Sequence, residues 1–154
     1  MLSQNNLDRI EVLKKRYPTK QALILHVLWM VQEQEGYISE ESMREVAGLL
    51  DLPVGHVLGV VTFYTMLHDK PMGKYHIEVC TNVSCMLRGS DRILEHLQQR
   101  TGVPCGTTSP DGKFTISETE CMGACGFAPM VAIGEEYYEN LTPEKVDEIL
   151  ERLS

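Results

Sequence analysis

The sequence predicts a protein of mixed helix and sheet (α+β or α/β), in which a helical bundle precedes an α/β domain. Apolar residues recur every three or four positions up to residue 67, which is typical of amphipathic helices. From residue 75 onward apolar and polar residues alternate, which is typical of strands. A polar segment with Pro71 and Gly73 separates the two patterns. We therefore expect two domains, residues 1–72 and residues 73–154.

Short helices are predicted throughout the first domain. One ends before Pro18, and the next runs from Gln21 to Gln34 and is apolar on nearly all sides, as in the centre of a bundle. Gly36 is typical of a helix end, and Ser39 is typical of the N-cap of the following helix. The apolar faces of the last two predicted helices are Met43, Val46, Ala47 and Leu50, and Val57, Val60, Val61 and Tyr64.

The second domain is predicted to have the order β-α-β, a loop, then β-β-α. Its first strand covers Tyr75 to Cys80, and a loop carries Cys85. A helix that ends at Gly102 leads to a strand at residues 114–117. Two strands joined through a helix are expected to be parallel, so their carboxyl ends meet at one edge of the sheet. The remaining expected elements are a loop over 121–129, a hairpin with strands at 130–133 and 137–139, and a helix capped by Thr142.

Cysteines form two pairs in the second domain, Cys80 with Cys85 and Cys121 with Cys125. The predicted parallel strands bring the two pairs together, which makes them a candidate site for an iron–sulfur cluster or a tetrahedral metal ion. The gaps of four and three residues favour a 2Fe–2S cluster, because two irons spread their thiolates more widely than one zinc ion. Zinc remains an alternative. The fifth cysteine, Cys105, has no partner at ligand spacing and is interpreted as structural.

Residues next to the cysteines are also expected to serve the site. Gly123 and Gly126 permit a close approach of the backbone to the sulfur atoms. Asn82 and Ser84 are expected to donate hydrogen bonds there. Met86 and Met122 each follow a cysteine, so we expect them to shield the site from water.

Composition argues against several classes of function. The net charge of −8 disfavours nucleic acid as a partner, because phosphate contacts need clustered basic residues. No apolar stretch is long enough to span a bilayer and no signal peptide is visible, so a cytoplasmic protein without direct membrane insertion is expected. Five cysteines without an export signal favour metal or cluster binding over disulfides. No phosphate-binding glycine loop is present, which places any nucleotide on another chain.

Taken together, these motifs resemble the thioredoxin-like 2Fe–2S component of NADH:quinone oxidoreductase, the E-subunit family. The resemblance covers nearly the whole chain, and the spacing of its cysteines is specific. In the second half it rests on Cys80-x₄-Cys85 with Leu87 and Gly89, and on Cys121-Met122-Gly123-Ala124-Cys125-Gly126-x-Ala128-Pro129. In the first half and the joint that follows it, the resemblance rests on Arg16-Tyr17-Pro18, Gly36-Tyr37-Ile38, Val61-Thr62-Phe63-Tyr64 and Gly73-Lys74-Tyr75.

The resemblance implies a helical bundle followed by a thioredoxin-like 2Fe–2S ferredoxin domain. By analogy with the thioredoxin fold, the Ala128–Pro129 peptide bond is expected to be cis. The implied cofactor is one 2Fe–2S cluster, and no residue of this chain is expected to be catalytic by itself. The implied ligands of the cluster are Cys80, Cys85, Cys121 and Cys125.

The implied function is electron transfer within the NADH dehydrogenase module of NADH:quinone oxidoreductase, respiratory complex I. The cluster would exchange single electrons with FMN on a partner flavoprotein subunit that also binds NADH, and further iron–sulfur subunits would complete the complex. The chain would lie on the cytoplasmic side of such a membrane-attached complex. NAD-linked hydrogenases, including electron-bifurcating ones, and formate dehydrogenases use the same family and are alternatives. A binding module with a structural zinc site is the alternative of another class.

Overall fold

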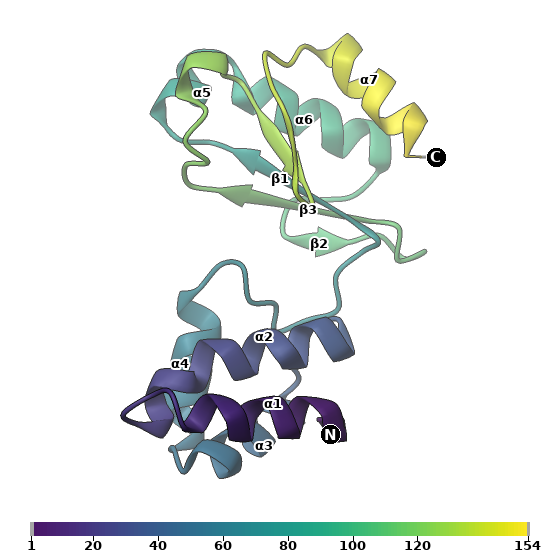
Figure 1. Ribbon diagram of the computed structural model, residues 1–154. Helices are drawn as coiled ribbons and strands as arrows, with labels where there is room; N and C mark the ends of the chain where they lie inside the picture. The colour runs from purple at the N-terminus through teal and green to yellow at the C-terminus, as the bar shows by residue number, and fades with distance from the viewer. Residues whose placement is uncertain (1, 154) are drawn as a thin grey trace. The chain divides into compact units, whose positions relative to one another are not determined.

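The computed structural model describes residues 2–153 of the chain (Figure 1). The chain divides into two compact units, Met1–Pro71 and Met72–Ser154, called here the helical unit and the sheet unit. The helical unit holds only helices among the described residues, whereas the sheet unit combines one sheet with helices. The predicted class of mixed helix and sheet is therefore confirmed.

Capping residues mark the ends of several helices in the helical unit. The hydroxyl of Ser39 accepts a hydrogen bond of 3.1 Å from the backbone N–H of Ser42, and Gly36 ends its helix with a φ of 83°. The predicted helix over residues 21–34 is in fact divided, because its first turn is a 3₁₀ helix. The elements are α1 (Gln4–Lys14), η1 (Lys20–Leu23), α2 (Ile24–Glu35), α3 (Glu40–Leu50) and α4 (Val54–Phe63).

A continuous apolar core holds the helical unit together, and one buried polar side chain ties down the segment after α4. The side-chain amide of Gln32 donates to the carbonyl of Met66 (2.9 Å), and its oxygen accepts from the N–H of His68 (2.7 Å). These bonds satisfy backbone groups that would otherwise lose water without a partner. Fully buried core residues include Ile10, Leu23, Val27, Leu28, Ile38, Val46 and Val57.

Within residues 2–153 no single helix is long and apolar enough to cross a membrane. Helices α3 and α4 reach the necessary length and hydropathy only as a pair, and that pair is bent by 120°.

A five-stranded sheet with the order β2-β3-β1-β4-β5 forms the centre of the sheet unit. The central strand β1 pairs in parallel with β3 along its whole length, from Tyr75 opposite Phe114 to Cys80 opposite Thr119. The predicted parallel pairing is therefore confirmed. The elements are β1 (Tyr75–Cys80), α5 (Val83–Leu87), α6 (Ser90–Thr101), β2 (Thr107–Thr108), β3 (Phe114–Thr119), η2 (Cys125–Phe127), β4 (Val131–Ile133), β5 (Glu136–Tyr138) and α7 (Pro143–Arg152).

Helices α6 and α7 lie side by side and contribute to the core of the sheet unit (Figure 1). Alternate residues of β1 and β3 point into this core, as the period of two requires. Each fully buried aliphatic side chain stabilises the unit by about 1.5–3 kcal/mol relative to exposure. The core residues are Ile77, Val79 and Ile116 of the strands, Ile93 and Leu97 of α6, and Val146, Ile149 and Leu150 of α7.

The close approach of residue 73 to β3 predicts that Gly73→Ala destabilises the sheet unit. A Cβ atom at this position would lie 2.6 Å from the carbonyl carbon of Phe114, and backbone cannot move aside as a flexible side chain can. We expect a loss of about 1–3 kcal/mol in the free energy of unfolding, measured by urea denaturation. Gly59→Ala in α4 is the control, because nothing lies within 4 Å of its Cβ position. An equal effect of both substitutions would contradict the steric explanation.

An ionic contact between α6 and α7 predicts acid sensitivity. A carboxylate oxygen of Asp147 lies 2.8 Å from Nε2 of His96 and 2.7 Å from Nε of Arg100. The hydrogen bond from His96 is the main cause that lowers the pKa of Asp147 below its ordinary value. A carboxylate with a depressed folded-state pKa stabilises the protein above its unfolded-state pKa of about 3.9, and this contribution disappears as the pH falls through the folded-state pKa.

Asp147→Asn is therefore expected to flatten the fall in stability below about pH 4. Urea denaturation at a series of pH values measures this slope. The control is Asp69→Asn, which removes an exposed carboxylate for which the described residues show no hydrogen bond. An unchanged acid slope in Asp147→Asn would show that the contact contributes nothing.

Candidate metal centre

Both cysteine pairs lie at the same edge of the sheet, because β1 and β3 run in parallel. Cys80 is the last residue of β1 and is paired with Thr119, the last residue of β3. Cys121 follows two residues after that strand ends. The backbone N–H of Thr81 also donates to the carbonyl of Thr119 (3.2 Å), so the two chain segments stay paired beyond the last strand residue. The topology thus delivers the two cysteine-bearing segments to one place.

The first pair of thiols is buried. Cys80 and Cys85 are each 2% exposed and form a small cluster with Ala128 and Met130. The thiol of Cys80 donates to the carbonyl of Glu120 at 3.2 Å, which links the first pair to the segment that carries Cys121. The Ala128–Pro129 bond beside this cluster is cis, which confirms the expectation from the sequence.

Cys85 lies in a helix, so its prediction as a loop residue is wrong. Residues 83–87 form the single-turn helix α5, and the side-chain oxygen of Asn82 accepts from the N–H of Val83 at 2.7 Å. Asn82 was expected to donate to the site, but its amide oxygen instead satisfies an unpaired N–H at the start of α5. An asparagine before a short apolar run is the sequence signal that could have revealed this helix.

The second pair of thiols is exposed and close together. The sulfur atoms of Cys121 and Cys125 are 3.8 Å apart. Two thiolates on one tetrahedral metal with bonds of about 2.3 Å would be separated by about the same distance. Gly123 has a φ of 81°, which a residue with a side chain rarely adopts, and its N–H donates to the sulfur of Cys121 at 3.4 Å. The donor set and its backbone support therefore suit a metal–thiolate group.

Burial sets the acid–base behaviour of Cys85. It is the largest cause that raises the pKa of Cys85 to about 11, and the hydrogen bond and charge of Cys80 act in the same direction. The charge of Cys125 also raises this pKa, so the two pairs interact electrostatically. Without a metal, Cys85 is protonated at neutral pH, and binding of a metal would release that proton.

Cys105 has different surroundings from the other four cysteines. Its backbone N–H donates to the side chain of Gln98 (2.9 Å), and its thiol lies 3.9 Å from a carboxylate oxygen of Glu118. Burial and the charge of Glu118 raise the pKa of this thiol. Cys105 packs against the core of the sheet unit, as a small apolar residue would.

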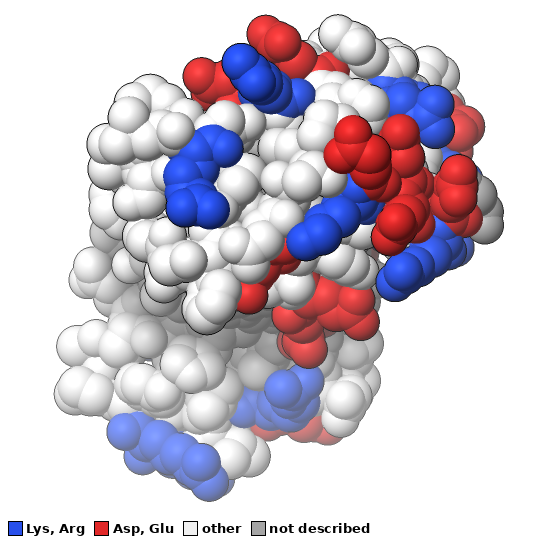
Figure 2. All heavy atoms as spheres, turned by 90° about the horizontal axis from the view of Figure 1, so that it is seen from above, with Lys and Arg blue, Asp and Glu red and all other residues white. Residues whose placement is uncertain are grey.

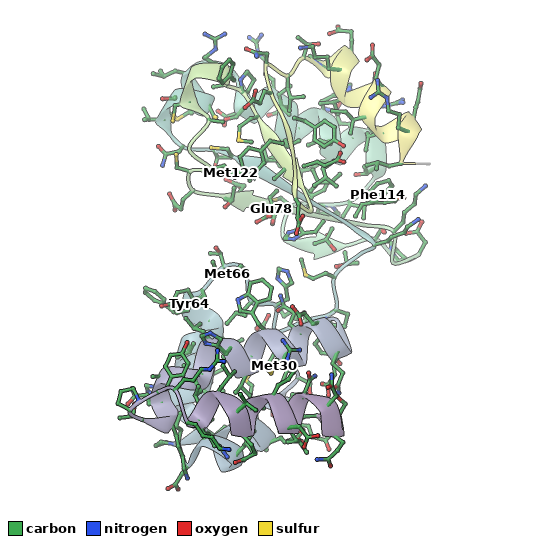
Figure 3. The ribbon with its side chains drawn as sticks, in the orientation of Figure 1. Met30, Tyr64, Met66, Glu78, Phe114 and Met122 are labelled. Carbon is green, nitrogen blue, oxygen red and sulfur yellow. The ribbon has the colours of Figure 1, made fainter. Side chains whose placement is uncertain are left out.

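An uncharged and partly apolar surface surrounds the thiols. Residues 80–87 and 121–134 contain no Lys, Arg, Asp or Glu. Met122, labelled in Figure 3, packs against the buried cluster, whereas Met86 is exposed and does not shield it. Val83, Leu87 and Phe127 are also exposed beside the cysteines. Of these three residues, the sequence motifs singled out only Leu87. On the face shown in Figure 2, acidic and basic side chains are interspersed and leave a wide uncharged area.

Known proteins resemble this chain along most of its length. Residues 10–154 match the family model described as thioredoxin-like [2Fe-2S] ferredoxin. The NADH-quinone oxidoreductase E subunit 2 of Rhizobium meliloti is 40% identical over 144 residues, which are 94% of this chain and 86% of that protein. The NADH-quinone oxidoreductase E subunit of Rickettsia conorii is 42% identical over 153 residues, which are 97% of this chain and 92% of that protein.

A solved structure shares the fold at lower sequence identity. The crystal structure of an NAD⁺-reducing [NiFe]-hydrogenase in the air-oxidized state contains a chain that superimposes with a TM-score of 0.74 and 20% identity. The match covers 85% of this chain but only 22% of the hydrogenase chain, so it concerns the fold alone. From the family model and the two E-subunit relatives, we conclude that the chain belongs to the family of thioredoxin-like [2Fe–2S] ferredoxins.

Proposed function

We propose that this chain is an electron-transfer subunit that carries one 2Fe–2S cluster in the NADH dehydrogenase module of an NADH:quinone oxidoreductase. The observation that carries the proposal is the meeting of two thiol pairs at one sheet edge, in a chain that two E-subunit relatives match at 40–42% identity over more than nine-tenths of its length. The chain contributes to an oxidoreductase as a subunit and is not catalytic alone.

The proposed cluster ligands are Cys80, Cys85, Cys121 and Cys125. When bound, a 2Fe–2S cluster takes up and releases one electron, and each of its irons needs two protein ligands. The thiols lie in two pairs, and the sulfur atoms of Cys121 and Cys125 are 3.8 Å apart, which suits two ligands on one iron. Among residues 2–153, no three His, Cys, Asp or Glu side chains surround a point closely enough to hold a single metal ion.

This chain's own residues would tune the site in three ways. Ala128 and Met130 exclude water from the inner thiols, which lowers the polarity of the surroundings. The N–H of Gly123 stabilises negative charge on the sulfur of Cys121. The exposure of Cys121 and Cys125 leaves one side of the site open to a redox partner.

The proposed electron partner is a flavoprotein subunit that holds FMN and binds NADH, together with further iron–sulfur subunits. The exposed apolar side chains beside the cysteines support a permanently bound partner, because an isolated protein rarely leaves such side chains in water without a function. We place the chain on the cytoplasmic side of a membrane-attached complex, and we assign residues 1–72 and 73–154 as its two domains.

A second candidate is the same kind of subunit in an NAD-linked hydrogenase. The observation behind it is the shared fold of a chain from an NAD⁺-reducing [NiFe]-hydrogenase. The sequence identity of 20% to that chain, against 40–42% to the E-subunit relatives, favours the first candidate.

The ligand assignment predicts the metal content of the purified protein. Anaerobic purification is expected to yield two irons and two acid-labile sulfides per chain, with a 2Fe–2S EPR signal after reduction. Cys121→Ser is expected to lose most of the iron or to change the EPR signal, because a hydroxyl is a poorer ligand than a thiolate. Cys105→Ser is the matched control and should keep its iron and its EPR signal.

A protein with one zinc ion and no sulfide would refute this assignment and support the structural-zinc alternative. Equal iron loss in Cys105→Ser and Cys121→Ser would show that the loss reflects general damage to the fold.

The assignment to a complex predicts which proteins co-purify with the chain. An affinity-tagged chain expressed in its own organism is expected to retain a flavoprotein that contains FMN, and the assembly should reduce a quinone with NADH. The isolated chain should not oxidise NADH. Retention of a hydrogenase subunit in place of quinone-reducing subunits would instead establish the second candidate.

A further inference from the structure

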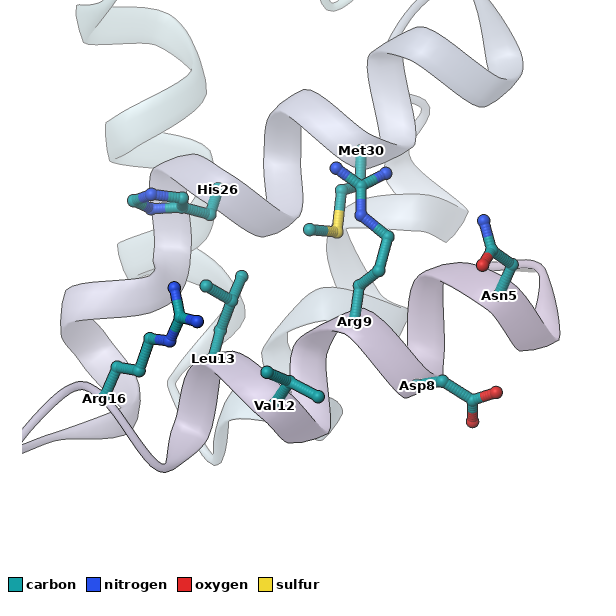
Figure 4. Close-up of a pocket in the computed structure, with 8 residues that line it drawn as sticks. All are labelled: Asn5, Asp8, Arg9, Val12, Leu13, Arg16, His26 and Met30. Carbon is teal, nitrogen blue, oxygen red and sulfur yellow. The ribbon is translucent and has the colours of Figure 1, made fainter.

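Helices α1 and α2 form an open groove on the surface of the helical unit (Figure 4). Its volume is about 420 Å³, and its apolar floor includes Leu13 of α1 and Met30 of α2. Arg9 of α1 and Arg16, which lies two residues after α1 ends, extend toward α2 in this groove (Figure 4). His26 of α2 lies beside Arg16. The groove thus combines an apolar floor with two fixed positive charges.

The two arginines are available to a ligand. Neither forms an ion pair with a carboxylate among residues 2–153, and the contact of Arg9 is a hydrogen bond of 3.3 Å to Asn6. Asp8 also lines the groove, but its side chain points away from α2 and accepts a hydrogen bond of 2.9 Å from Gln4 (Figure 4). Both guanidinium groups are exposed, so they can pair with the carboxylates of a ligand.

The groove continues past Met30 into a second hollow of about 340 Å³. The two hollows share Arg9, His26 and Met30, and the second adds Trp29, whose side chain is 42% exposed. Glu33 is the acidic residue in this second part. Tryptophan and arginine are the residues that most often dominate the binding energy of protein interfaces. Their presence along an elongated, open groove favours a polypeptide over a small, enclosed ligand.

We propose that this groove binds an acidic amphipathic helix of another subunit, an inference that rests on the proposed membership in a complex. Arg9 lies in α1, and Arg16 lies in the turn that follows the helix, where its N–H donates to the carbonyl of Leu13 at 2.8 Å. Seven residues separate the two arginines, which corresponds to about two helical turns or roughly 10 Å. Two carboxylates with the same spacing on the bound helix pair with them, and an apolar side chain between those carboxylates contacts Leu13 and Met30. Complementary charge then sets the orientation of the bound helix.

A second copy of this chain fits the groove less well. The acidic helix α7 has the required amphipathic pattern, but Val146, Ile149 and Leu150 are already buried in the sheet unit. Helix α3 likewise buries Met43 and Val46 in its own core. Neither of these acidic helices offers a free apolar face, which favours a different protein as the occupant.

The single tryptophan of the chain provides the test, because Trp29 lies in the wall of the groove. Overlapping peptides tiled along every co-purifying subunit are titrated against the full chain while Trp29 fluorescence is recorded. We expect a saturable blue shift with a peptide that carries two acidic residues about two helical turns apart, and a weaker response in high salt. The same peptide with lysines at those two positions should not bind.

Arg9→Glu combined with Arg16→Glu is expected to lower the affinity of the chain for that peptide by at least about tenfold. Lys15→Glu combined with Arg92→Glu changes the net charge equally at two exposed positions outside the groove and should bind normally. Iron content and the EPR signal should be unchanged in both variants, so this test is separate from the test of the cluster. In the assembled complex, the Arg9/Arg16 variant should lose its partner subunits at lower salt than the control.

Three outcomes would overturn the proposal. The first is that no tiled peptide shifts the emission of Trp29. The second is that the responding peptides are basic or neutral. The third is that both double variants bind the acidic peptide equally well. Self-association of the wild-type chain that the Arg9/Arg16 variant abolishes would assign the groove to a second copy instead.

Discussion

The parallel pairing of β1 with β3 is the constraint on which the rest of the site depends. The register from Tyr75 opposite Phe114 to Cys80 opposite Thr119 brings both strands to an end at one edge of the sheet. A slip of one residue would turn Ile77, Val79 and Ile116 out of the core, so the core that buries them also holds the register. The position of the thiols is thus determined by apolar side chains away from them.

The same arrangement gives the two thiol pairs opposite surroundings. Cys80 and Cys85 are covered by Ala128 and Met130, whereas Cys121 and Cys125 lie on an exposed loop and a 3₁₀ turn. A group held by all four would be shielded from water on one side and reachable from the other. Low polarity around one part of an iron–sulfur site and access to another part are the features that tune its potential and permit exchange with a partner.

Most of the fold follows from local sequence signals, because those signals are strong and independent of one another. The alternation in residues 75–80 predicts the bounds of β1, and Gly102 and Thr142 mark helix ends as expected. The predictions fail for short elements. α5 is only five residues long, too short for a helical period to emerge, and η1 depends on tertiary packing of Leu23 in the core.

The site was predictable as a set of residues but not in its detail. Spacing identified the four cysteines as candidates, since parallel strands bring their carboxyl ends together. The exposure of Met86 and the capping role of Asn82 both follow from the orientation of α5, which no pattern in the sequence specifies. The groove between α1 and α2 was likewise invisible, because Arg9 and Arg16 resemble any exposed basic residues until α2 is placed beside them.

The residues that can bind a cluster are distributed unevenly between the two units. All five cysteines lie in the sheet unit, so the four proposed cluster ligands all come from residues 72–154. The helical unit buries its own core and yet leaves Trp29 and Phe63 exposed, the latter at 76%. Trp29 lines the second hollow of the proposed groove, so a bound helix would cover it. Under the functions proposed above, the sheet unit would transfer electrons and the helical unit would bind a partner, as separate tasks of one chain.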